Sequence, residues 1–81
     1  MVADNEIQRG LIAKEILQND IFVESINKIR SELMNEWINS DTQNSEQRED
    51  IWKMRKMLEV VVNELQTVLE TGKLATKNNK S

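Results

Sequence analysis

Residues 45–72 decide the fold: they read SEQREDIWKMRKMLEVVVNELQTVLETG, the longest uninterrupted helical pattern in the chain. On a helical wheel most of their apolar side chains fall within about 120° of one another. Asn44 or Ser45 can cap the start, and Gly72, which tolerates positive φ, predicts the end of this helix. The apolar positions alternate spacings of three and four residues, which is typical of a helix that packs along another helix: Ile51, Met54, Leu58, Val61, Leu65 and Val68.

Two further helices are expected before this one. The first covers residues 5–18, where apolar side chains face several directions and Gly10 weakens the helix by about 1 kcal/mol relative to alanine. Asp20 predicts the cap of a second helix over residues 20–39. One face of that second helix is apolar and comprises Phe22, Ile26, Ile29, Leu33 and Trp37.

The connections complete the expected architecture. A polar segment over residues 39–44 is short enough to return the chain in the opposite direction. Residues 73–81 lose the helical period and predict a loose basic tail. The sequence therefore predicts a single small all-α domain over residues 1–81, with three helices, of which the second and third form a long antiparallel helical hairpin. Counting outward from the connecting segment places Trp37 near Ile51 or Trp52.

Charge is unevenly distributed along the 81 residues, whose formal net charge is −3. Residues 1–50 carry eleven acidic and five basic side chains, whereas residues 51–81 carry three acidic and six basic ones. Lys53, Arg55 and Lys56 point in three directions on the wheel, and a helix that reads a DNA groove would gather them on one face. Nucleic acid is therefore the weaker of the partner classes that we consider.

The residues needed for common chemistry are missing. The chain has no histidine and no cysteine, which removes the commonest general base, the commonest metal ligand and the strongest nucleophile. Glu32 and Glu36 stand one helical turn apart but lack the histidine of a di-iron pattern. We expect no enzyme, no catalytic residue, no cofactor and no metal site. We also expect an intracellular protein without a membrane span, because no apolar run approaches about 20 residues and no signal peptide precedes the first helix.

A mismatch of apolar faces predicts an interface. The hairpin can cover one side of the first helix, through Ile12 and Ile16, and other large side chains then stay near the surface. Trp52 lies off the main apolar stripe of its helix, where it is either covered by the first helix or an anchor for a partner. We expect a homo-oligomer, with a symmetric dimer favoured, or a complex with another protein. The candidate interface residues are Ile7, Leu11, Leu17, Trp52 and Val60.

Several short strings together resemble the small helical proteins that tailed bacteriophages encode among their virion and packaging genes. They are Arg9-Gly10, Glu36-Trp37, Arg48-Glu49 followed by Trp52, and Glu70-Thr71-Gly72-Lys73-Leu74-Ala75. The resemblance implies a phage or prophage origin and a non-enzymatic helper role, and it carries over no functional residue.

The function expected from the sequence is thus a non-catalytic helical interaction or assembly protein, such as a phage virion or assembly component. One alternative is the oligomerising part of a DNA-packaging or regulatory factor. The other is an inhibitor that binds a single host protein.

Overall fold

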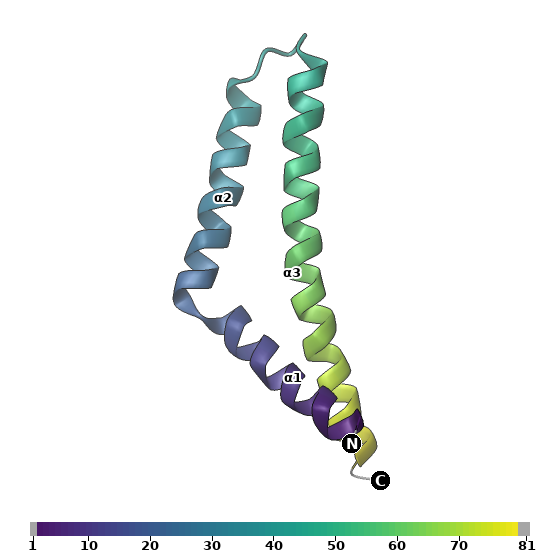
Figure 1. Cartoon of the computed structure of the whole chain (residues 1–81). Helices are drawn as coiled ribbons and strands as arrows, with labels where there is room; N and C mark the ends of the chain where they lie inside the picture. The colour runs from purple at the N-terminus through teal and green to yellow at the C-terminus, as the bar shows by residue number, and fades with distance from the viewer. Residues whose placement is uncertain (1, 80–81) are drawn as a thin grey trace.

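The structure, a computed structural model, describes the backbone of residues 2–79 and the side chains of residues 5–78. This part of the chain forms three α-helices: α1 (Val2–Gln18), α2 (Asp20–Asn39) and α3 (Ser45–Asn79). The expected all-α fold with three helices is confirmed. From the loop that joins them, α2 and α3 run in opposite directions, and α1 returns from the far end of α2 to cross α3 near its C-terminal end (Figure 1).

The molecule is extended. Its Cα atoms span 57 × 23 × 16 Å and have a radius of gyration of 17.4 Å, whereas a compact chain of 81 residues would have about 12 Å. The long dimension follows from α3, whose 35 residues reach roughly 52 Å at the α-helical rise. One long helix therefore sets the shape, and the other two are attached to it.

The main packing contact is between α1 and α3, and it centres on two glycines. A Cβ atom added to Gly10 would lie 2.8 Å from the Cα of Gly72, and a Cβ added to Gly72 would lie equally close to the Cα of Gly10. Both glycines are buried, as are Ala13 and Ala75 one turn further along each helix. The lack of large side chains here lets the two backbones touch.

This crossing corrects the expected end of the third helix. Helix α3 passes through Gly72 and continues to Asn79, and no glycine in the described chain has a positive φ. The loose tail expected over residues 73–81 is therefore wrong for residues 73–79, while residues 80 and 81 lie outside the described range. Gly10 is likewise a contact point of its helix, which begins at Val2 and not at residue 5.

Contacts between α2 and α3 are few by comparison. Helices α2 and α3 run in opposite directions (Figure 1), but they pack closely mainly toward the loop, where Leu33 and Ile51 are buried, so the expected long hairpin is not clearly shown. Farther from the loop, Arg30 donates from Nε to Glu59 Oε1 at 2.7 Å and joins the helices. The two helices therefore leave much of their facing surfaces uncovered.

Capping side chains fix the helix starts. Asn19, and not the expected Asp20, caps α2: its Oδ1 accepts a hydrogen bond from the Phe22 backbone N–H at 3.0 Å. The cap expected at Asn44 is confirmed, since its Oδ1 accepts from the Gln47 N–H at 3.0 Å. Each cap fixes the residue at which the chain leaves a connecting segment and enters a helix.

The loop between α2 and α3 is held by the buried Ser40. Its Oγ donates to the Trp37 carbonyl oxygen at 2.6 Å and accepts from Arg48 Nε at 2.9 Å. The Arg48 guanidinium also lies 4.8 Å from the centre of the Trp37 ring, which is the geometry of a cation–π contact. The first turn of α3 is thus tied to the last turn of α2.

Candidate protein-binding surface

The apolar seam of α3 is covered at its two ends, whereas in the middle Leu58 and Leu65 are half-buried and one side of the seam is open. Near the loop, Ile51 is buried beside α2, and toward the C-terminus Val68 and Leu69 are half-buried where α1 crosses. Between these points Met54 and Val61 are 49% and 50% exposed, although their spacing places them on the same seam. The sequence predicted the seam, but α1 and α2 cover only part of its middle.

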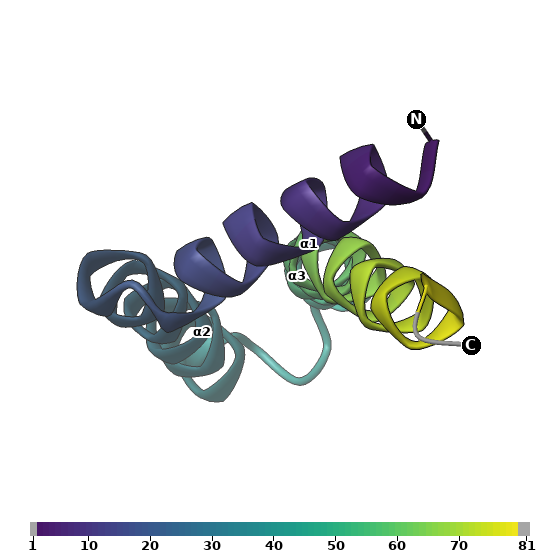
Figure 2. The same cartoon turned by 90° about the horizontal axis from the view of Figure 1, so that it is seen from below.

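Exposed neighbours extend this uncovered segment. Met57, one turn from both Met54 and Val61, is 63% exposed, and Val60 beside it is also exposed. We call Met54, Met57 and Val61 the open stripe. On the wheel it is continuous with Gly72 and Ala75, all five falling within about 60°. Helix α1 lies across one side of α3 (Figure 2), so it occupies the C-terminal continuation of the open stripe and leaves the stripe itself free.

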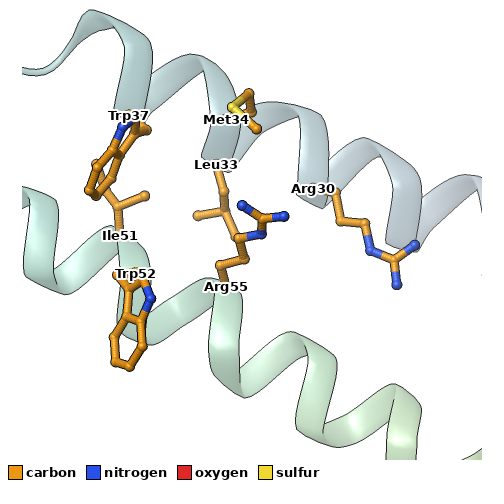
Figure 3. A pocket seen from close by; sticks show the side chains of 7 residues that line it. All are labelled: Arg30, Leu33, Met34, Trp37, Ile51, Trp52 and Arg55. Atoms are coloured by element: carbon orange, nitrogen blue, oxygen red, sulfur yellow. The ribbon is translucent and has the colours of Figure 1, made fainter.

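A second uncovered region lies between α2 and α3 near the loop. It is a mainly apolar cleft of about 240 Å³. In Figure 3, Ile51 points toward Trp37, and Arg55 reaches from α3 toward Leu33. Tryptophan, methionine and arginine are enriched at protein interfaces. The residues that line the cleft are Arg30, Leu33, Met34, Trp37, Ile51, Trp52 and Arg55.

A bidentate ion pair joins α2 to α3 at Arg30, one of the residues that line this cleft. The guanidinium of Arg30 donates to both carboxylate oxygens of Glu59, at 2.7 and 3.1 Å. The hydrogen bond from Arg30, and then the positive charges of Arg30 and Arg55, hold the pKa of Glu59 below its ordinary value despite some desolvation. The same hydrogen bond raises the pKa of Arg30. Both side chains remain partly exposed, so the pair orients α2 on α3 more than it stabilises the fold.

The structure does not bring the five predicted interface residues together. Ile7, Leu11 and Leu17 lie on α1, the first and last half-buried and Leu11 exposed. Trp52 is exposed in the cleft, with the Lys56 ammonium 4.9 Å from its ring centre, and Val60 adjoins the open stripe.

The reason is that α1 packs through a different face from the one expected. Gly10 and Ala13 meet α3, while Ile12 and Ile16, which were expected to be covered, remain exposed. Met54 and Val61 were missed as interface residues because their regular spacing was read as burial within the chain.

The described part of the chain contains no group of three or more histidine, cysteine, aspartate or glutamate residues that could hold a metal ion. No buried side-chain nitrogen or oxygen in the same range lacks a hydrogen-bond partner. Among the described helices, none is both long and apolar enough to cross a membrane.

Comparison with known proteins identifies no relative. No protein-family model matches the chain, and no curated protein or solved structure shows a significant match. The surface described above is therefore the basis for assigning a function.

Proposed function

We propose that this chain is a non-catalytic interaction protein whose open stripe on α3 binds another helix. The observation that carries the proposal is the half-exposure of Met54 and Val61 on a seam that is otherwise covered by α1 and α2. A heptad-like seam of this kind accepts the side chains of a facing helix. The bound helix belongs to a second copy of the chain or to another protein.

The energetic incentive for such a partner is large. Fully burying one methionine or valine side chain contributes about 1.5–3 kcal/mol, and the stability of a chain of this size is only several kcal/mol. Met54, Met57 and Val61 are 49%, 63% and 50% exposed, so covering the remainder of all three represents about 2–5 kcal/mol, a large share of the stability of the whole chain. Methionine also adapts its shape to an incoming surface.

Local pairing of the basic residues favours a protein partner over nucleic acid. Lys53 lies 3.5 Å from Glu49, and Lys73 lies 3.6 Å from Glu70. A phosphate-binding surface would leave such charges available to the nucleic acid. A DNA-associated role, a phage virion or assembly role and the inhibition of one host protein are narrower proposals that rest on the sequence alone.

The test is site-specific photo-crosslinking in the cell that expresses the protein. In one variant a photoreactive residue replaces Val61. In a control variant it replaces Asn63, which is exposed on the opposite side of α3. We expect crosslinked species with the Val61 variant and none with the Asn63 control. Equal labelling at both positions, or no labelling at Val61, would reject the open stripe as a binding surface.

A further inference from the structure

We infer that the helix covering the open stripe is α3 of a second copy, which crosses the first α3 in the antiparallel direction with Met57 facing Val61 of the second copy. This inference rests on the proposed function and names its partner. The molecule would then be a two-fold dimer in which both open stripes cover each other. Three features argue for it: the exposed area, the charges beside the stripe, and the position of α1.

The exposed area matches what a stable dimer needs. The chain exposes 6475 Å², whereas a compact monomer of 9.5 kDa would expose about 5,000 Å². The excess is larger than the roughly 800 Å² that each partner buries in a standard protein interface. Covering about 800 Å² of each chain with a second copy would therefore bring its accessible area part of the way from 6475 Å² to that of an ordinary folded protein.

The charges beside the stripe fit a two-fold arrangement, which requires a self-complementary surface. Lys53 and Glu64 lie along one edge of the stripe, at its N-terminal and C-terminal ends, within about 20° of each other on the wheel. When Met57 faces Val61 of an antiparallel copy, Lys53, whose ammonium lies 3.5 Å from Glu49 of its own helix, also lies beside Glu64 of that copy, and the reciprocal pair follows by symmetry. In a parallel two-fold pair the two copies of this edge would lie on opposite sides of the interface, and Lys53 would not meet Glu64 of the second copy.

The position of α1 decides how the second helix must lie. Because α1 already occupies the C-terminal continuation of the open stripe at Gly72 and Ala75, a second α3 cannot follow the seam over its whole length. It must cross at an angle over the few turns from Met54 to Val61, as in the inclined helix packing common in globular proteins. The contact is therefore short, and the methionines fill the irregular space at the crossing.

The absence of cysteine from the sequence makes disulfide trapping a clean test. Met57→Cys and Val61→Cys proteins are mixed in equal amounts and oxidised, and we expect the mixed disulfide to form faster than either like pair. Met54→Cys should not crosslink with itself, because its two copies would lie about 15 Å apart along the helix, beyond the 4.4–6.8 Å Cα separation of disulfides. Asn63→Cys is the matched control on the opposite face and should also form no disulfide between copies.

Light scattering after size exclusion measures the mass without any crosslink. We expect twice the chain mass at high concentration, and the mass of one chain for Val61→Glu. A monomer throughout, from about 1 to about 300 µM, or faster crosslinking of Met57→Cys with itself than with Val61→Cys, would overturn the inference. A monomer whose Val61 still crosslinks to a different protein would overturn the second copy alone, whereas loss of all crosslinking at Val61 would reject the proposed function as well.

Discussion

Gly72→Ala tests whether the contact between α1 and α3 depends on the absence of a side chain. The added Cβ would lie 2.8 Å from Gly10 Cα and 3.0 Å from the Glu6 carbonyl oxygen. Both obstacles are backbone atoms, which cannot rotate away as a side chain could. Carbon atoms in ordinary contact are about 3.5–4.0 Å apart, so α1 must move away from α3 by roughly 1 Å.

Two opposing effects set the size of the change. Alanine stabilises the interior of a helix by about 1 kcal/mol relative to glycine, and overpacking costs about 1–3 kcal/mol. We therefore expect Gly72→Ala to lower the free energy of unfolding by up to about 2 kcal/mol. Gly72→Leu, with a larger side chain at the same point, should lose more.

Urea unfolding followed by far-UV circular dichroism measures these free energies. Asn63→Gly and Asn63→Ala form the matched control, because Asn63 is an exposed position within α3. The difference between them should be the usual preference for alanine, about 1 kcal/mol. The opposite result is that Gly72→Ala raises the free energy of unfolding by as much as Asn63→Ala exceeds Asn63→Gly. That result would refute the close approach of the two helices.

Three further changes probe the rest of the molecule. Leu33→Ala should lower the free energy of unfolding in urea by about 2–5 kcal/mol, because Leu33 is only 8% exposed. Ile38→Ala, at a position that is 66% exposed, should change it by no more than about 0.5 kcal/mol. Similar losses for the two variants would contradict the burial pattern. Ser40→Ala removes both hydrogen bonds that tie the loop and should cost about 1–3 kcal/mol, so an unchanged urea midpoint would show that the loop does not depend on them. The fold lowers the pKa of Glu59, so the original protein should be more stable than Glu59→Gln above pH 4.5, the ordinary pKa of this group. This difference in stability should disappear as the pH falls through the lowered pKa. A difference in thermal midpoint between the two proteins that persists at about pH 3 would refute the role of the Arg30 pair.

The helices could be predicted from sequence because their signals are local. A spacing of three and four residues marks a helix wherever it packs, and Asn44 followed by Gln47 marks a helix start. Gly72 was misread for the same reason. A glycine followed by lysine-rich polar residues has the local pattern of a helix end, and only Gly10, near the other end of the chain, explains why the helix continues.

The sequence predicted which apolar residues share the seam of α3, but not which of them the fold leaves exposed. The spacing identified Met54 and Val61 as members of a seam, but whether they are covered depends on the direction in which α1 and α2 leave their connections. The small residues of α1 decide this, because Gly10 and Ala13 let α1 approach α3 more closely than its isoleucines would. No periodicity argument reveals that preference, since a glycine and an alanine add little to an apolar face.

The contact between the two glycines also has a consequence for the order of folding. It joins residues near opposite ends of the chain, so the largest packing surface forms only after nearly the whole chain has closed on itself, at a cost in loop entropy. Such distant contacts slow folding relative to helical proteins whose contacts are local. During synthesis α1 is made well before Gly72 and Ala75, to which it docks. A chain that stops before Gly72 would keep the segments that form helices and lose the surface that α1 needs.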